Sequence, residues 1–258
     1  MNGAFDLVAR SDRGRVRARN EDSVAVDEAL GLAALADGMG GLLDGHEASR
    51  AAVEAALEHL RAFDRAGRTA AGAESLVIAA VQAANRQVLA FAGDRAGSMG
   101  TTLEVLRLSP DGACQAAHVG DSRTYRLRGG ALERLTRDHS MVQDMVERGL
   151  LRPEQARAAL NRNVITRAVG LADAVEADGV AFDLAPGELV LLCSDGLWDM
   201  LDEPQIERLL GGCGPGRAGL DDCADRLVAA ANAAGGADNI SVVLARRTGA
   251  GPVPGVSL

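Results

Sequence analysis

The chain carries several aspartates that each stand at the end of an apolar run, where a strand would finish. They are Asp22, Asp37, Asp121, Asp195, Asp199 and Asp238. A carboxylate at a strand end can be directed into a cleft without being buried unpaired. If several such ends converge, their oxygens form the kind of site that Mg²⁺ or Mn²⁺ prefers. The pattern therefore indicates metal-assisted hydrolysis, with a phosphoester as the favoured substrate.

The segment LADGMGG shows both the chemical interpretation and its ordinary alternative. An apolar run ends at Asp37 and is followed by glycines. Because glycine lets the backbone approach a ligand closely, the Asp37 carboxylate and the Gly38 carbonyl could both bind a metal. An Asp-Gly turn explains the same residues, and this segment by itself favours the turn.

Asp195 and Asp199 lie four residues apart after the apolar run ELVLLC. A helical turn opened by Ser194 would place both carboxylates on one face. Acidic residues near a helix start are also favoured by the helix dipole, so a simple capped helix is an equal alternative.

Asp121 and Asp238 have ordinary alternatives as well. Asp121 ends a run in HVGDSR, where a salt bridge to Arg123 would explain it. Asp238 precedes Asn239 and the last apolar run, where a turn would explain it. Each position is weak evidence alone, but their repetition at separate strand ends favours one shared site.

Arg17, in RVRARNED, supplies positive charge close in sequence to Glu21 and Asp22. A guanidinium can hold phosphate oxygens with two parallel hydrogen bonds. A surface ion pair of little energetic value is the alternative. Arg13, Arg15 and Arg19 offer the same chemistry, so the sequence does not separate them from Arg17.

Short β-type runs with helical segments between them must position these residues. Strands are expected at 5–10, 23–27, 31–36, 102–108, 114–119, 124–128, 131–135, 175–184, 188–193 and 240–247. Helices are expected at 46–63, 73–91, 203–210 and 221–234. Gly129-Gly130 predicts a hairpin, and Asp202 with Pro204 and Gln205 predicts a helix start. The short spacing of the strands favours antiparallel sheets.

The chain of 258 residues, 47% of them hydrophobic, fits one large domain, which we expect to span 1–248. Residues 138–165 form an insert between strands that we expect to be mobile relative to the sheets. We expect one helix in its segment SMVQDMVERGLL and a second, short helix that restarts at Arg152-Pro153 and runs to about Leu160. Residues 249–258 are rich in glycine and proline and lack a core pattern, so we expect a disordered tail.

Composition limits the possible partners and compartment. The net charge of −9 argues against nucleic acid as a partner. The four cysteines contain no CxxC pair, which favours incidental thiols in a reducing compartment over a zinc site or disulfides. The N-terminus lacks a signal-peptide pattern, and no apolar run is long enough to span a bilayer. We therefore expect a soluble, cytoplasmic protein without a membrane partner, acting as a monomer.

Several motifs together resemble those of the metal-dependent protein serine/threonine phosphatases of the PP2C type (PPM), in their bacterial form. The motifs are RxxNED, DGMGG, GTT at 100–102, VGDSR, LTRDHS at 135–140, ITRAVG at 165–170, SDGLWD and ADNISVVL. They stand in the family's order over roughly residues 5–247. The resemblance implies an α+β fold, a four-layer αββα sandwich of two antiparallel β-sheets flanked by helices.

The resemblance also implies a role for each matching residue. Arg17 would hold the substrate phosphate. Asp37 would bridge two Mn²⁺ or Mg²⁺ ions, with the Gly38 carbonyl on one of them, and Asp195 and Asp238 on the other. The remaining implied metal ligands are Glu21 and Asp22, which would bind metal or its waters, and Asp121 and Asp199, which with Asp195 would form a weaker third site.

One position departs from the family pattern. Eukaryotic relatives have a histidine after the Asp-Gly pair, proposed as the general acid, and this chain has Met39. A thioether cannot donate a proton, so the leaving group would take its proton from a metal-bound water, which we favour, or from another group. His139 is the other candidate, although a structural hydrogen bond at a turn explains it better.

The expected function is hydrolysis of phosphoserine and phosphothreonine in proteins, opposing a bacterial Ser/Thr kinase. Two alternatives remain open. A non-catalytic member that binds phosphoproteins is disfavoured by the intact Asp37, Asp195 and Asp238. A phosphatase of small phosphometabolites is not excluded, because the catalytic centre reads the phosphate and leaves the choice of leaving group to the insert.

Overall fold

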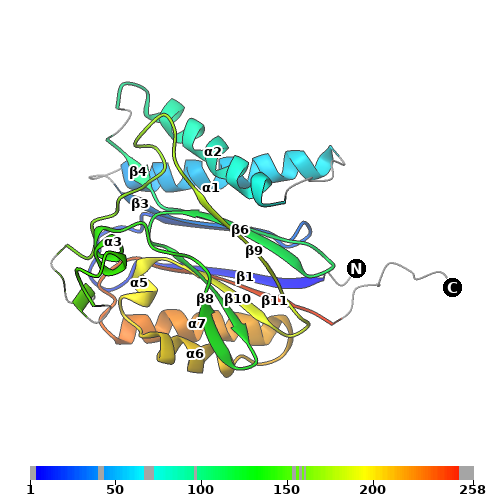
Figure 1. Ribbon diagram of the computed structural model, residues 1–258. Helices are drawn as coiled ribbons and strands as arrows, with labels where there is room; N and C mark the ends of the chain where they lie inside the picture. Colours follow the sequence, from blue (N-terminus) through cyan, green and yellow to red (C-terminus); the bar gives the residue numbers. More distant parts are fainter. Residues whose placement is uncertain are drawn as a thin grey trace.

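Two antiparallel sheets lie face to face between two layers of helices (Figure 1). The structure is a computed structural model, which describes residues 4–39, 44–66, 73–95, 98–152, 155–156, 159 and 161–249. The expected four-layer αββα fold class is confirmed.

The first sheet has the strand order β1-β11-β10-β7-β8. Its strands are β1 (Phe5–Asp12), β11 (Ile240–Arg247), β10 (Leu189–Cys193), β7 (Arg123–Arg128) and β8 (Ala131–Arg134). The first and last strands of the chain are therefore neighbours, paired from Phe5 opposite Arg247 to Asp12 opposite Ile240.

The second sheet has the order β2-β3-β5-β6-β9, with a short strand β4 paired to the end of β3. Its strands are β2 (Asp22–Asp27), β3 (Leu32–Met39), β4 (Gly100–Thr101), β5 (Leu103–Leu108), β6 (Ala113–Val119) and β9 (Asp178–Asp183). Asp22 and Asp37 lie opposite each other in the β2–β3 pairing, so two of the predicted site residues meet through strand register alone.

Each sheet is covered by helices on its outer face. The helices α1 (Asp44–Arg65) and α2 (Ala73–Ala92) pack on the second sheet, and a 3₁₀ turn (Gly93–Arg95) follows α2. The helices α5 (Asp195–Trp198), α6 (Glu203–Gly211) and α7 (Gly216–Ala233) pack on the first sheet. The insert contributes α3 (Met141–Glu147), which lies at the same end of the molecule as α5 (Figure 1).

Successive side chains along each strand alternate between the core under the helices and the core between the two sheets. In β10, Leu189 and Leu191 pack toward the helices, whereas Val190 and Leu192 pack between the sheets. In β3, Ala34 packs toward α1 and α2 by the same rule. Since successive strand side chains point to opposite faces, a continuous apolar strand must be covered on both sides.

The expected elements are mostly confirmed, with three shifts. The capping box of Asp202 and Gln205 starts α6, and Gly129 and Gly130 form the β7–β8 turn. The helix expected at 221–234 begins earlier, at Gly216, because Leu220 is fully buried in the core against the first sheet. The strand expected at 175–184 is shorter and runs only over β9.

The third shift is in the insert. Its first helix is only α3, because the chain reverses at Gly149, which adopts a φ of 70°. The second helix expected there, after Pro153, includes positions outside the described residues, and so does the tail from residue 250 onward. The mobility of the insert stays a prediction.

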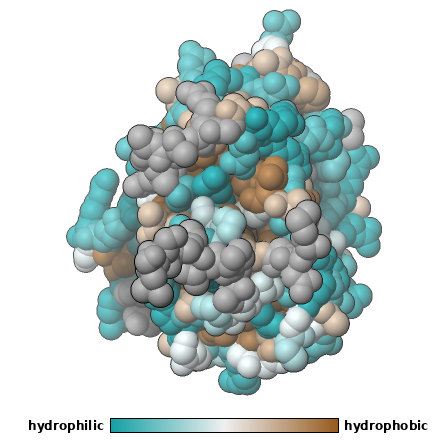
Figure 2. All heavy atoms as spheres, turned by 90° about the vertical axis from the view of Figure 1, so that its right-hand side faces the viewer, coloured by the Kyte–Doolittle hydropathy of each residue, from teal (hydrophilic) through white to brown (hydrophobic). Residues whose placement is uncertain are grey.

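The surface opposite the α3–α5 end is mainly polar. Figure 2 shows the face at the right of Figure 1, where most of the described side chains are hydrophilic. Among the described residues, no helix combines the length and the apolar composition that crossing a bilayer would require.

Candidate active site

The predicted carboxylates converge at one end of the sandwich and come from both sheets. Asp22 and Asp37 belong to β2 and β3, and Asp121 follows β6. Asp195 opens α5 directly after β10, and Asp238 lies just before β11. Burial and the negative charge of the other four aspartates raise the pKa of Asp37 well above its ordinary value. The other four carboxylates are therefore close enough for the charge of each to affect the ionisation of Asp37.

Burial is the main cause of the raised pKa values, and repulsion between the carboxylates adds to it. The pKa of Asp22 is raised to about 7, that of Asp121 to about 8 and that of Asp195 to about 6. Hydrogen bonds from Ser194 and Ser241 partly oppose the shift at Asp22. A folded chain that holds these groups together at neutral pH must either bind protons or bind cations.

The donor atoms fit hard divalent cations. Asp22 and Asp195 each have a buried Oδ1 without a hydrogen-bond partner among the described residues. A buried carboxylate oxygen that lacks a donor is costly, and a cation would satisfy it. Because the converging side chains offer oxygen ligands, the site suits Mg²⁺ or Mn²⁺ better than a thiolate-seeking metal.

Two serines join the sheets beneath the carboxylates. The Ser194 hydroxyl donates to Asp22 Oδ2 over 2.8 Å and accepts a hydrogen bond from the backbone N–H of Ser241 over 3.0 Å. The contact links β2 of one sheet to β10 and β11 of the other. No local sequence pattern indicates this role of Ser194 and Ser241, although both stand inside the SDGLWD and ADNISVVL motifs.

Asn239 fixes the loop that carries Arg17. Its side-chain oxygen accepts from the N–H of Glu21 over 2.8 Å, and its amide group donates to the carbonyls of Arg13 and Arg19 over 2.9 and 2.8 Å. The loop before β2 is thereby tied to the start of β11. Asn239 had been interpreted only as part of a turn, and no sequence signal indicated these long-range partners.

Threonines of the GTT motif hold Asp37 through its backbone. The N–H of Asp37 donates to Thr102 Oγ1 over 2.9 Å, and its carbonyl accepts from the N–H of Thr102 over 2.9 Å. Thr101 Oγ1 donates to the same carbonyl over 2.8 Å. The motif was recognised in the sequence, but the contacts that explain it come only from the structure.

Gly38 lies where no side chain could fit. Its N–H donates to the carbonyl of Glu21 over 3.2 Å, and a Cβ added to Gly38 would lie 2.1 Å from the carbonyl oxygen of Gly45. This close approach brings Glu21, Gly38 and the start of α1 together. The predicted Asp-Gly turn is thus the extended end of β3, with glycine required by packing.

Arg17 is the arginine that faces the carboxylates. Its Nη2 donates to Asp238 Oδ2 over 2.6 Å, and the charges of Asp238, Asp195 and Asp37 raise its pKa. The side chain is 53% exposed, so the guanidinium also reaches solvent. Arg15 instead lies near Asp12 and helps to lower the pKa of that carboxyl. The structure therefore separates two arginines that the sequence could not.

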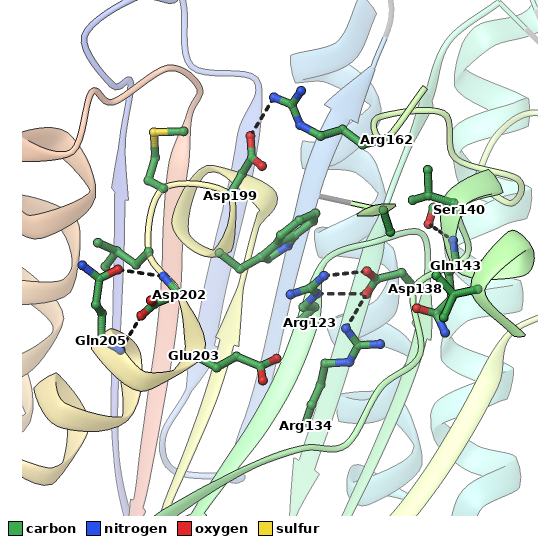
Figure 3. A pocket seen from close by; sticks show the side chains of 16 residues that line it. Arg123, Arg134, Asp138, Ser140, Gln143, Arg162, Asp199, Asp202, Glu203 and Gln205 are labelled. Carbon is green, nitrogen blue, oxygen red and sulfur yellow. Dashed lines mark hydrogen bonds and ion pairs between the residues drawn. The ribbon is translucent and has the colours of Figure 1, made fainter. Parts of the chain in front are cut away.

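Asp199 stands at the margin of the site. Its N–H donates to the carbonyl of Asp195 over 2.8 Å, so the predicted helical turn after Ser194 is confirmed. Its carboxylate pairs with Arg162 of the insert over 3.2 Å. The pair borders a cleft of about 700 Å³ between α3 and the α5–α6 segment, lined also by Trp198 and Glu203 (Figure 3).

Arg123 forms its salt bridge with Asp138 and not with Asp121, the partner suggested by the sequence. Its Nε and Nη2 donate to the two oxygens of Asp138 over 3.0 and 2.7 Å, rather than to Asp121. The guanidinium lies 3.7 Å from the ring centroid of Trp198. The indole N–H donates to the carbonyl of Asp121 over 3.0 Å, so Trp198 positions the Asp121 peptide.

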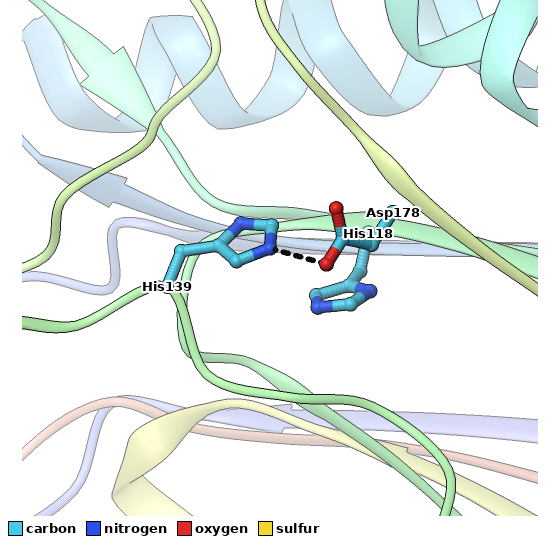
Figure 4. A group of neighbouring side chains, drawn as sticks. All are labelled: His118, His139 and Asp178. Atoms are coloured by element: carbon cyan, nitrogen blue, oxygen red, sulfur yellow. Dashed lines mark ion pairs between the residues drawn. The ribbon is translucent and has the colours of Figure 1, made fainter. Parts of the chain in front are cut away.

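His139 has both ring nitrogens engaged outside the carboxylate cluster. Its Nδ1 accepts from the N–H of Gly120 over 3.2 Å, and its Nε2 lies 3.2 Å from Asp178 Oδ2 (Figure 4). The ring stacks on His118, with 4.6 Å between centroids. Burial lowers the pKa of His139, which favours the neutral ring. These contacts support the structural interpretation of His139 over a general acid.

His118, His139 and Asp178 also resemble a set of metal ligands, since their donor atoms lie within 4.8 Å of one another. However, Arg167 Nη1 already donates to Asp178 Oδ1 over 2.9 Å, and His118 Nε2 is bonded to the Arg137 carbonyl over 2.7 Å. The Arg167 guanidinium therefore already neutralises Asp178, and no metal is needed there. We assign His118, His139 and Asp178 a structural role in packing the insert.

Comparison with known proteins identifies the family. The model of the family described as protein phosphatase 2C matches residues 13–234. The chain belongs to the protein phosphatase 2C family. The converging aspartates are therefore part of a PP2C fold.

Bacterial relatives of this PP2C chain are similar over nearly its whole length. A serine/threonine phosphatase, stp, of Listeria welshimeri is 35% identical over 92% of this chain and 94% of its own. Serine/threonine protein phosphatase PstP of Mycobacterium tuberculosis is 39% identical over 92% of this chain and 44% of its own. The solved catalytic domain of PstP in complex with two manganese ions superimposes with a TM-score of 0.81, at 36% identity, covering 95% of this chain and 98% of that one.

The raised pKa values predict how the stability of the metal-free PP2C chain depends on pH. The folded-state pKa values of Asp22, Asp121 and Asp195 exceed the ordinary 3.8, so the folded state binds more protons than the unfolded state up to about pH 8. In a chelating buffer, the free energy of unfolding should therefore fall between about pH 6 and about pH 8, by at least about 1 kcal/mol. Urea unfolding followed by Trp198 fluorescence measures this change.

Asp195→Asn tests the cause of that dependence. The substitution removes one buried charge and keeps the shape, so it should raise the stability of the metal-free protein near pH 8 and flatten the pH dependence. Asp225→Asn is the control, because Asp225 is an exposed carboxylate paired with Arg10. A slope that Asp195→Asn leaves unchanged would contradict the repulsion argument.

Proposed function

We propose that the chain is a metal-dependent phosphatase that hydrolyses phosphoserine and phosphothreonine in proteins, opposing a bacterial Ser/Thr kinase. The observation that carries the proposal is the convergence of buried carboxylates from both sheets with Arg17 facing them, in a chain of the PP2C family. The relatives named serine/threonine phosphatases support the class of substrate.

The carboxylate cluster would hold two Mn²⁺ or Mg²⁺ ions and, more weakly, a third. Asp37 would bridge the first two, with Gly38 on one side and Asp195 and Asp238 on the other. The remaining assigned ligands are Glu21, Asp22, Asp121 and Asp199. When bound, such ions supply positive charge to the phosphoester and lower the pKa of a coordinated water. The two manganese ions in the PstP structure favour Mn²⁺ for this chain.

The chain's own residues would bind and orient the substrate. Arg17 would hold the phosphate oxygens through the N–H donors of its guanidinium group. Its ion pair with Asp238 directs this group toward the carboxylate cluster. Thr101 and Thr102 would keep the Asp37 backbone from shifting as charge builds up. Because Met39 cannot donate a proton and His139 is engaged elsewhere, water is the favoured source of the leaving-group proton.

We also propose the domain limits that follow from this function. Residues 1–248 would form the phosphatase domain, and residues 138–165 would act as a flap beside the site. The ion pair between Arg162 of this insert and Asp199 supports a flap that contacts the metal-binding margin. The cleft next to it, with a volume of about 700 Å³, would receive the side chains that flank a phosphorylated residue.

The first test is phosphate release with and without Mn²⁺ from a phosphothreonine peptide, an aryl phosphate and a sugar phosphate. Asp37→Asn should abolish Mn²⁺-dependent hydrolysis while leaving the fold intact, because the neutral amide cannot hold two cations close together. Asp225→Asn should keep full activity. Wild-type turnover by Asp37→Asn at saturating Mn²⁺ would refute the metal assignment, and a preference for the sugar phosphate would refute the protein substrate.

Arg17→Ala should lower kcat/KM for phosphorylated substrates by roughly 10- to 100-fold, mainly through KM. The expected loss is about 1.5–3 kcal/mol, the scale of a hydrogen bond to a charged group. Arg15→Ala is the matched control, because the charge of Arg15 acts on Asp12 and helps to lower the pKa of that carboxyl. If Arg15→Ala causes the larger defect in steady-state kinetics, the phosphate is held by a different arginine.

His139→Ala should reduce hydrolysis of an aryl phosphate and of a phosphothreonine peptide to a similar degree. A general acid would matter by about 10²-fold or more for the peptide alone, whose alkoxide needs a proton. His59→Ala, on α1, controls for the loss of a histidine at a partly exposed position. A large loss specific to the peptide would make His139 a proton donor.

A further inference from the structure

Two of the four cysteines face each other where α6 meets α7. Cys213 follows the end of α6 and is partly exposed, whereas Cys223 lies within α7 and is buried. The two cysteines are neighbours, because Cys213 Sγ approaches the carbonyl of Gly219, which lies one helical turn before Cys223 in α7. Each sulfur also lies near a carbonyl of the opposite segment, Cys213 Sγ 3.5 Å from Gly219 O and Cys223 Sγ 3.6 Å from Leu209 O. Both are free thiols in the structure.

Two arginines lie beside the backbone segment that carries the partly exposed thiol. Arg226 Nη2 donates to the carbonyl of Gly212 over 2.9 Å, and Arg246 Nη2 donates to the carbonyl of Cys213 itself over 3.5 Å. Positive charge beside a thiol stabilises its thiolate, which is the reactive form. The neighbouring Cys223 thiol and the charges of Arg246 and Arg226 outweigh the opposing effect of burial and lower the pKa of Cys213 to about 7.

The remaining cysteines have the opposite environment. Cys114 and Cys193 are buried, and burial raises the pKa of both thiols, that of Cys114 to about 12. The pKa of Cys223 is also raised, because the neighbouring Cys213 and the burial of Cys223 favour the neutral thiol. The pair therefore combines one accessible thiolate with one neighbouring thiol, the arrangement of an attacking and a resolving cysteine.

We propose that Cys213 and Cys223 form a modification site at which hydroperoxides produce a reversible disulfide, with Cys213 as the attacking thiol. The Cys213 thiolate attacks one oxygen of the peroxide and breaks the O–O bond, giving a sulfenic acid on Cys213 and releasing hydroxide. The thiol of Cys223 then attacks that sulfur, forming the S–S bond and releasing water. Over both steps, two thiols are oxidised and one hydrogen peroxide is reduced to two waters.

The site is separate from the proposed catalytic centre. Gln205 is the last residue of α6 that lines the cleft, and the helix ends six residues later at Gly211, so the pair lies at least about 9 Å of helix away from the cleft. The disulfide would cross-link the end of α6 to α7. The proposal does not rest on phosphatase activity, and its readout is the chemical state of the cysteines.

The test exposes the folded wild-type protein to a small molar excess of hydrogen peroxide, blocks remaining thiols and maps them by mass spectrometry. We expect a peptide pair joined through Cys213 and Cys223 that a dithiol reductant releases. Cys114 and Cys193, as internal controls, should stay reduced until the protein is unfolded. Cys223→Ser should accumulate a dimedone-reactive sulfenic acid at Cys213, and Cys213→Ser should leave Cys223 unmodified.

The role of the arginines can be measured in the same assay. Arg226→Gln removes one positive charge beside Cys213 and should slow its reaction with peroxide by about 3-fold or more. Arg217→Gln is the control, since Arg217 is exposed and pairs with Glu28. Oxidation of all four cysteines at similar rates, cross-links only between molecules, or no cross-link before methionines become oxidised would each overturn the proposal.

Discussion

Repulsion among buried carboxylates is the constraint on which the rest of this structure depends. Asp22, Asp37, Asp121 and Asp195 all have raised pKa values because the fold removes them from water and places them side by side. A chain that only maximised its stability would avoid such a cluster. The folded state therefore needs positive charge to neutralise the clustered carboxylates. Arg17 supplies part of this charge, and divalent cations would supply the rest.

The double-sheet architecture is what makes this cluster possible. No single sheet could bring the five aspartates together, because β2, β3 and β6 belong to one sheet and β10 and β11 to the other. The Ser194 hydroxyl, placed between Asp22 and Ser241, ties the sheets together just below the carboxylates. The repulsion among the aspartates is therefore opposed by many modest interactions. They are the packing between the two sheets and the hydrogen bonds beneath the carboxylates.

The two ends of α6 serve different parts of the molecule. Its capped start, at Asp202, borders the cleft beside the flap, while its end leads to Cys213 and the thiol pair. The same short helix thus connects the proposed substrate cleft to the proposed site of covalent modification.

The sequence by itself predicted antiparallel sheets from the short spacing of its strands, and the ordered motifs, through their family resemblance, predicted the fold class and the carboxylates of the cluster, because motif order and strand spacing are local properties of the chain. It named Asp37, Asp195 and Asp238 but could not choose between Arg15 and Arg17, which have the same chemistry. Only the tertiary structure decided that choice, gave Arg123 to Asp138 and paired Cys213 with Cys223. Such partners lie far apart in sequence or depend on side-chain direction, and no periodicity records the distance between them.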